Sequence, residues 1–424
     1  MGASGRVIIA AAACAGLLAA AAPASAAFRF AEPGGDGPAE SCADTNPCDL
    51  EDAVEDASVN DGDEVFVLPG DYLLDTQTLT IADAIDVHGI AGAPRPRLIS
   101  SAVGQGVDVT SAGARLTQLE IHYAGPDVAL AMSGSTAQRL VVASLGTSAC
   151  AFAPATVRDS VCWDAAPGGR AVRSSTPIGT STTTTARNLT AVATGSGSIG
   201  ISVGTAGPGT AHTFDGRNVI ADATVDVARN ANNPAMANVD LSFSNFDTAT
   251  SNGSGAMTLP GSPTNQLSPP QFVNPGVGDF HQAVGSPTID AGSDVGGLGS
   301  LDFDGEPRVQ GAAPDIGADE FFPSTQPASG NVDRFPPDTK ITDGPKKKIK
   351  KRNVKFDFGG SEPGVTFECQ LDDGGFEPCS PPQKLKGLDR GAHVYAVRAI
   401  DAAGNADPTP ADRRWRVKKR NRNG

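Results

Sequence analysis

Lysine is absent from the first 339 residues, because the first lysine is Lys340 and all earlier basic side chains apart from histidine are arginines. Residues 28–330 hold 12 arginines against 35 aspartates and glutamates, a net charge of −23. Nucleic-acid binding depends on basic side chains that neutralise phosphates, so we expect no nucleic-acid partner for this part of the chain. Residues 331–424 reverse the balance, with 20 lysines and arginines against 13 acids. The asymmetry predicts two domains with different surfaces.

Long apolar runs are missing everywhere except at the N-terminus. Arg6 precedes such a run, which ends in the small residues Ala24, Ser25, Ala26 and Ala27. This arrangement is typical of a secretory signal peptide, which we place at residues 1–27. No later run is long enough to span a bilayer. We therefore expect a secreted, extracellular or cell-surface protein without a transmembrane segment.

Cysteine is scarce, and six of the seven cysteines follow the signal peptide in three close pairs. An exported chain with an even number of cysteines favours disulfides over free buried thiols, which are the alternative. Six cysteines allow 15 connectivities, but local pairing needs no long-range closure. The predicted bonds are Cys42–Cys48, Cys150–Cys162 and Cys369–Cys379.

Up to about residue 250, helical periodicity occurs only in the short segment that directly follows residue 49. Leu50, Ala53, Val54 and Ala57 recur at the spacing of an apolar helix stripe. The rest of the chain up to about residue 250 contains short strand-like runs that end in turn residues. We expect the helix to cover the open edge that the end of a sheet would otherwise expose.

One type of strand recurs every 20 to 30 residues, as "QLEIH", "RLVVA", "DSVCW", "NLTAV" and "NVIAD", starting at Gln118, Arg139, Asp159, Asn188 and Asn218. "AIDVH" from Ala84 fits one step before this series, and "LSFSNF" from Leu241 fits one step after it. Such recurrence indicates a repeat solenoid, and two or three strands per repeat suit a parallel β-helix. The polar residue before several strands tolerates the left-handed conformation of a sharp corner.

Several segments resemble known families. "PCDLEDAVEDA" with the later "GDEVFVLPGDY" resembles the start of right-handed parallel β-helix proteins of the pectate-lyase-like superfamily. "SPTIDAG", "DFDGEPR" and "PDIGADEF" resemble the choice-of-anchor Q module of exported bacterial β-helix proteins. These resemblances imply an all-β chain with an N-terminal capping helix and a right-handed parallel β-helix over residues 28–321. The Q-like terminal module covers residues 286–321.

The C-terminal part has a different pattern. Residues 322–336 are rich in proline and serine and are predicted to form a linker. Residues 337–418 alternate apolar and polar positions at strand length, which predicts a small antiparallel β-sandwich. This part is similar to Ig-like or fibronectin-like modules. Residues 419–424 form a basic tail.

An acid-x-His pair occurs twice, as Asp86 with His88 and as Glu120 with His122. If their strands occupied adjacent coils, all four side chains would point outward from neighbouring rows about 4.8 Å apart. Such a group could carry acid–base catalysis or share a metal. The alternative is the polar outer face of a repeating scaffold, and we favour that alternative.

Other side chains suggest ligand contacts. Asp302 and Asp304 place two carboxylates at alternate positions, which suggests Ca²⁺; solvated turn acids or carboxylates bonded to backbone amides are the alternatives. Tyr123 and Trp163 fall at strand ends and could stack on sugar rings, although packing is favoured for Trp163. The basic run "KKKIKKR" at residues 346–352 suits an anionic wall polymer or a solvated strand.

Known catalytic signatures of β-helix enzymes are missing. The predicted β-helix contains no lysine, no Gly-His-Gly stretch and no Asp-Pro-His-His stretch. We therefore expect a non-catalytic protein that binds an extracellular polysaccharide or cell-envelope polymer. The alternatives are a divergent polysaccharide lyase or glycoside hydrolase, and a purely structural stalk.

Overall fold

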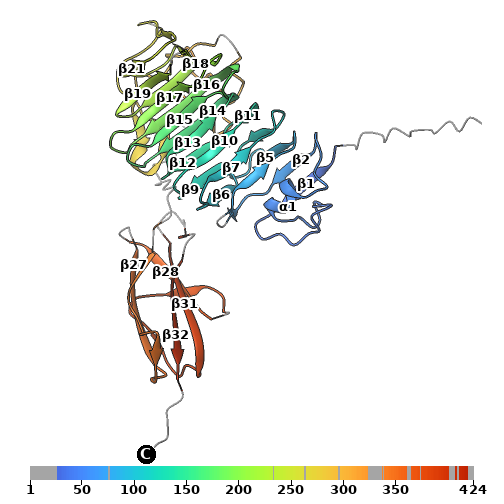
Figure 1. Ribbon diagram of the computed structural model, residues 1–424, viewed down its shortest axis with the longest axis vertical. Coiled ribbons are helices and arrows are strands. Elements are labelled where there is room, and N and C mark those ends of the chain that lie inside the picture. Colours follow the sequence, from blue (N-terminus) through green and yellow to red (C-terminus); the bar gives the residue numbers. More distant parts are fainter. Residues whose placement is uncertain are drawn as a thin grey trace, which may run out of the picture.

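The computed structural model describes residues 26–74, 77–232, 234–261, 264–294, 297–322, 337, 339–360, 364–372, 374–400, 406–407 and 410–418. The predicted signal peptide up to residue 25, the linker after residue 322 and the basic tail lie outside the described residues. The predicted all-β fold is confirmed, since a column of long parallel sheets precedes a small sandwich (Figure 1). No described helix is long and apolar enough to cross a membrane.

Three runs of parallel strands wind around the column. Sheet A contains β1 (Phe28–Ala31), β2 (Glu64–Val67), β5 (Asp86–Gly89), β8 (Arg115–Thr117), β11 (Ser135–Gln138), β14 (Ala155–Asp164), β16 (Ser181–Ala193), β18 (Ala211–Asp222), β20 (Met236–Ser242) and β22 (Met257–Thr258). Sheet B contains β3 (Asp71–Leu73), β6 (Arg97–Ser100), β9 (Glu120–Tyr123), β12 (Val141–Ser144) and the second halves of β14, β16 and β18. Sheet C contains β4 (Leu79–Ile81), β7 (Gln105–Val109), β10 (Val128–Met132), β13 (Ser148–Phe152), β15 (Arg170–Ser175), β17 (Ile199–Thr205), β19 (Val225–Ala231) and β21 (Ala249–Asn252).

The corner between sheets A and B repeats one backbone conformation. All five residues predicted to start the repeated strands have a positive φ, between 49° and 57°. In the following coil the corner is Phe243, two residues after the predicted start at Leu241. Asn188 donates to Asp159, and Asn218 donates to Asn188, so a buried ladder of side chains links successive corners.

The interior of the column is filled by aliphatic side chains from all three sheets. Ile85, Val87, Leu119 and Ile121 point inward as predicted, and each is at most 1% exposed. The three predicted disulfides are confirmed, and the bond Cys150–Cys162 links β13 to β14 inside the column.

The N-terminal helix α1 (Leu50–Glu55) is only six residues long. Leu50, Ala53 and Val54 are buried against the column. Asp49 caps the helix, because its side chain accepts a hydrogen bond from the backbone N–H of Asp52. Strand β1, and not the helix, forms the end of sheet A. The helix instead reaches the end strand of sheet C, where Glu55 accepts a hydrogen bond from the backbone N–H of Thr80 at 2.5 Å. The predicted capping is therefore limited to that edge.

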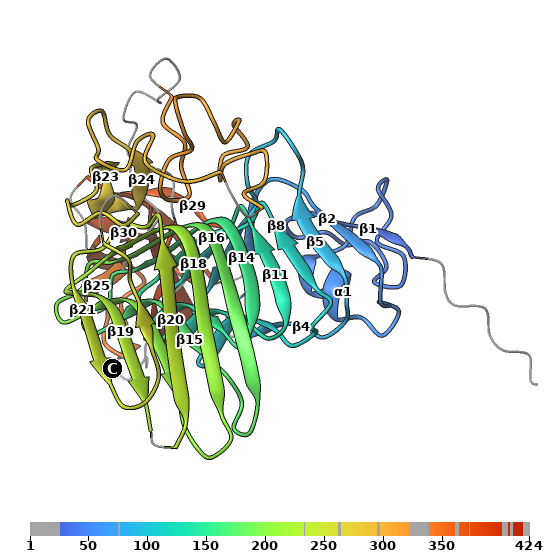
Figure 2. The same cartoon turned by 90° about the horizontal axis from the view of Figure 1, so that it is seen from above.

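Residues 271–321, which we call the return segment, run back along the outside of the column. The segment contains β23 (Phe272–Asn274), the 3-10 turn η1 (Pro275–Val277) and β24 (Asp279–Gln282). Phe280 and Phe303 form an apolar cluster with the outward side chains of sheet B, namely Val141, Ala143, Val161, Trp163 and Val192. The region predicted as a terminal module therefore covers one side of the column (Figure 2).

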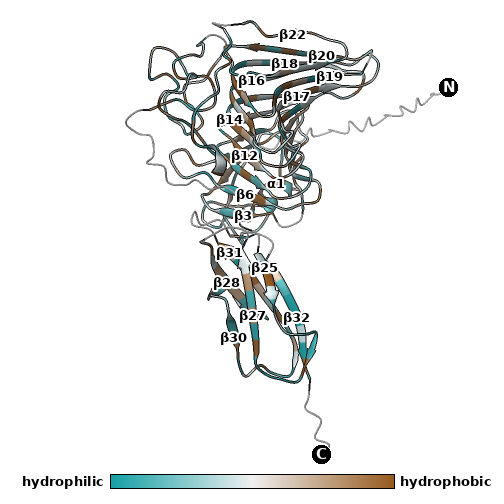
Figure 3. Ribbon diagram, turned by 90° about the vertical axis from the view of Figure 1, so that its left-hand side faces the viewer, coloured by the Kyte–Doolittle hydropathy of each residue, from teal (hydrophilic) through white to brown (hydrophobic). Residues whose placement is uncertain are grey.

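The C-terminal sandwich consists of two small sheets (Figure 3). One contains β25 (Thr339–Asp343), β27 (Val354–Gly360) and β30 (Gln383–Leu385). The other contains β26 (Lys348–Ile349), β32 (Ala411–Val417), β31 (Gly391–Ile400), β28 (Thr366–Leu371) and β29 (Glu377–Cys379). Phe356, Tyr395 and Trp415 pack between them, and the disulfide Cys369–Cys379 joins the paired strands β28 and β29.

Candidate functional site

The two acid-x-His pairs do not form one site. Strand β5, with Asp86 and His88, lies in sheet A between β2 and β8. Strand β9, with Glu120 and His122, lies in sheet B between β6 and β12. The two pairs therefore do not lie in the neighbouring rows that a shared site would require, and alternation alone does not reveal which sheet a strand joins.

Glu120 and His122 pair with each other at 2.7 Å (Oε1 to Nε2), and the imidazole is only 3% exposed. The two aromatic candidates are also buried. Tyr123 is 1% exposed, and its hydroxyl donates a hydrogen bond to the backbone carbonyl of Ala102. Trp163 is 2% exposed and packs against Phe280. Neither ring is available for stacking on sugars, because the column interior covers Tyr123 and the return segment covers Trp163, whose packing was the favoured alternative.

Sheet A carries two outward rows of side chains, which together we call the sheet-A face. The first row runs through Phe28, Glu64, Asp86, Arg115, Thr136, Thr156, Thr185, Asp215, Asp240 and Thr258. The second runs through Phe30, Phe66, His88, Thr117, Gln138, Arg158, Arg187, Arg217 and Ser242. All these side chains are partly or fully exposed. Figure 2 shows the strands of this face side by side.

The N-terminal end of the sheet-A face combines aromatic rings with charged groups. Phe66 stacks against Phe30 at 4.9 Å between ring centroids and meets the His88 ring edge-on at 4.6 Å. Phe28 is 66% exposed and contacts the same Phe66 ring. His88 Nε2 lies 2.9 Å from Glu64 Oε1.

Asp86 lies in the row beside His88 and is the second acid of this end of the face. Its carboxylate Oδ2 lies 3.6 Å from Arg115 Nε. Burial raises the pKa of Asp86, and the nearby charges of Arg115 and His88 oppose that rise. The predicted catalytic pair Asp86 and His88 thus lies on an open face with Glu64 as an added partner.

The other end of the face presents arginines from three successive strands. Arg187 donates to Asp215 at 2.7 Å, and Arg217 lies 3.4 Å from the Ser242 hydroxyl. Nε of Arg158, in the preceding strand, is buried and has no hydrogen-bond partner among the residues that the structure describes. At the corner nearby, Arg139, Gln118 and Asp304 line a pocket of about 490 Å³.

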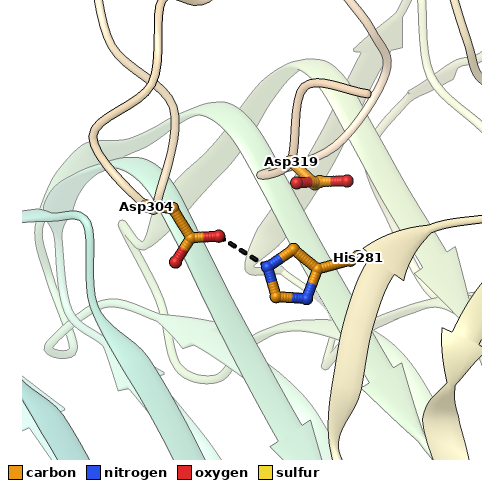
Figure 4. Close-up of side chains that lie close together, drawn as sticks. All are labelled: His281, Asp304 and Asp319. Carbon is orange, nitrogen blue, oxygen red and sulfur yellow. Dashed lines mark hydrogen bonds and ion pairs between the residues drawn. The ribbon is translucent and has the colours of Figure 1, made fainter. Parts of the chain in front are cut away.

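A second group of ionisable residues lies within the return segment (Figure 4). Ligand atoms of His281, Asp304 and Asp319 lie within 4.8 Å of one another, the spacing of a metal site. However, His281 Nε2 lies 2.6 Å from Asp304 Oδ2, and its Nδ1 lies 2.6 Å from Asp279 Oδ1. Asp304 is also paired with Arg95 at 3.1 Å.

These contacts hold the imidazole as a cation. Desolvation alone would favour the neutral ring, but the hydrogen bonds to Asp279 and Asp304 outweigh it and raise the pKa of His281 to about 10. Burial would raise the pKa of Asp304, but the hydrogen bonds and charges of His281 and Arg95 lower it below its usual value. A protonated ring has no free nitrogen lone pair, so this arrangement forms an ion pair in preference to coordinating a metal.

The predicted Ca²⁺ ligands do not act together. Asp302 accepts hydrogen bonds from the backbone N–H groups of Asp304, Glu306 and Glu320 at 2.8 to 3.2 Å. Asp304 faces His281 and Arg95 instead. Asp302 therefore matches the alternative of a carboxylate bonded to backbone amides, and we assign no Ca²⁺ site to the pair.

The His281 ion pairs should make stability depend on pH. Because the folded pKa is raised from 6.5 to about 10, the stabilisation is fully present below about pH 6.5 and is lost as pH rises through about 10. We expect His281→Gln to lower the unfolding free energy by roughly 2–4 kcal/mol near pH 6. The difference from the parent protein, followed by denaturant unfolding, should shrink toward pH 10. A difference that stays constant over this range would contradict the ion-pair assignment.

The sequence contains one signal for this group of residues. Asp279 and His281 in β24 repeat the acid-x-His pattern of Asp86 and His88, and the His281 ring bridges Asp279 and Asp304. No protein-family model matches the chain, and no curated protein matches it either.

Proposed function

We propose that this chain is an exported protein that binds an extended extracellular polysaccharide along the sheet-A face without cleaving it. The observation that carries the proposal is the pair of unbroken outward rows across sheet A, with the exposed Phe28 ring at one end. An extended ligand suits this face, because successive strands present outward side chains about every 4.8 Å.

The other two sheets offer less to a ligand. The outer face of sheet B is apolar across β12, β14 and β16, where it lies under Phe280 and Phe303, and its first strands carry the ion pair Arg97–Asp71. Sheet C has one central outward row of mostly small side chains: Thr80, Asp108, Ala131, Ala151, Arg173, Ser202, Ala228 and Thr250. Sheet A combines exposed aromatic carbon with hydroxyl, amide and charged groups, as amphipathic sugar rings require.

The family resemblances are part of the same proposal. A pectate-lyase-like β-helix, a Q-like module in the return segment and an Ig-like sandwich would together suit a bacterial extracellular protein. Three disulfides support an oxidising location such as the cell exterior. The proposed partner is a polysaccharide or cell-wall polymer.

A panel of soluble glycans would test the proposal by affinity electrophoresis or calorimetry. Phe28→Ala combined with Phe66→Ala should weaken binding about tenfold, since two ring contacts contribute roughly 1–3 kcal/mol. Val103→Ala is the matched control, because Val103 is 85% exposed and lies outside the sheet-A face. Equal losses in both variants, or no glycan bound by the parent protein, would overturn the proposal.

A second candidate function is glycan cleavage at the same face. The hydrogen bond between Glu64 and His88, with the partly buried Asp86 beside it, is an arrangement capable of acid–base chemistry. New reducing ends or unsaturated products, lost in both Glu64→Gln and His88→Ala, would favour the enzyme. Retention of glycan without products would favour the binding protein.

A further inference from the structure

We propose that the C-terminal sandwich is a separate binding module for an anionic polysaccharide. The contact surface is the basic edge, which we define as Lys348, Lys350, Lys351, Lys355, Lys384 and Arg416. These six side chains are exposed. The inference does not depend on the sheet-A face, because it concerns another domain and another class of glycan.

Like charges face one another across paired strands of the basic edge. Lys348 is the register partner of Arg416 in β26 and β32, and Lys355 is the partner of Lys384 in β27 and β30. Like charges directly opposite each other destabilise a sheet. Of these four side chains, Lys355 alone has an ion pair among the described residues, with Asp357 at 3.1 Å. A bound polyanion would offset this repulsion with new attractions to each cation.

A shallow pocket of about 440 Å³ is lined by one of these four side chains, Lys355. Pro345, Ile349 and Val354 supply apolar walls, and Lys350 and Lys351 also line it. Apolar walls next to ammonium groups match a sugar ring that carries a carboxylate or sulfate. Lysine ammonium groups act as mobile point charges without the fixed fork of arginine, so the module should recognise charge density more than one exact sequence of sugars.

Charge also explains why the sandwich, and not the column, would hold such a polymer. Residues 28–330 carry a net charge of −23 and would repel a polyanion, whereas residues 331–424 carry +7. Arginines on the column are partly neutralised, as Arg187 is by Asp215. The two domains would then bind different glycans.

The test compares binding of the full chain to dextran sulfate, polygalacturonate and uncharged dextran. Lys348→Gln, Lys351→Gln and Lys384→Gln together should weaken dextran sulfate binding at least about tenfold at low salt. They should also reduce the salt dependence of the affinity. The matched control combines Lys340→Gln, Arg173→Gln and Arg390→Gln, which removes the same charge elsewhere. All six substituted side chains are exposed, and thermal unfolding would verify that both variants fold.

Each outcome decides the inference. Loss in the first variant with retention in the control supports the basic edge. Equal loss of dextran sulfate binding in both variants would show that net charge alone, and not the basic edge, causes the binding. No loss in either variant would show that the polymer binds elsewhere. Salt-sensitive self-association without dextran sulfate binding would make the acidic column of a second copy the occupant. Phe28→Ala with Phe66→Ala should leave dextran sulfate binding intact, so this result is separable from that for the sheet-A face.

Discussion

Replacing Arg308 by methionine is expected to destabilise the protein by about 3–5 kcal/mol, because it leaves the buried Asp159 without its cation. Arg308 is 1% exposed and Asp159 is fully buried, and their side chains meet at 3.0 Å. Arg308 also donates to the backbone carbonyls of Gly317 and Asp319. It therefore fastens the end of the return segment to the corner between sheets A and B.

Denaturant unfolding and limited proteolysis would measure this effect. The return segment should become the first site of cleavage, since its anchor is removed while the column keeps its disulfides. Arg173→Met is the control, because Arg173 is an exposed arginine of sheet C. Unchanged stability of Arg308→Met would show that the ion pair does not hold the segment.

Replacing Trp163 by alanine should cost about 3–5 kcal/mol, the usual range for a buried aromatic side chain. Trp163 is 2% exposed, meets Phe280 edge-on at 5.5 Å and donates from Nε1 to Thr194. Its loss would open a cavity between sheet B and the return segment. The apolar outer face of sheet B would then be exposed to solvent.

Binding of a hydrophobic dye, together with the thermal midpoint, would report this opening. Trp163→Phe is the matched variant, because it keeps an aromatic contact with Phe280 and should recover much of the stability. A Trp163→Ala protein with the parent midpoint and no dye binding would contradict the packing described here.

Several features of the fold were predicted correctly from the local sequence. The close spacing of the cysteines was sufficient for the three disulfides, because each bond joins neighbouring strands or turns. The corner positions followed from residues such as Asn188 and Asn218, which adopt the left-handed conformation at low cost. Alternation also identified the inward residues, since Val87 and Ile121 are both buried.

The candidate site was harder to predict, because it depends on which sheet each strand joins. Asp86 and Glu120 occur in similar local sequences, yet β5 and β9 belong to different sheets. Phe30, Phe66 and His88 become neighbours only through register, with unequal separations along the chain. The apolar run around Val141 did indicate that both faces of β12 are buried.

Hydroxyl-radical footprinting of the full chain with and without its glycan tests most directly whether the sheet-A face is the binding surface. We expect Phe28, Phe66 and His88 to become protected at saturation, while Val103, which lies outside the sheet-A face, keeps its reactivity. Unchanged oxidation of the three face residues in a fully bound sample would contradict the account.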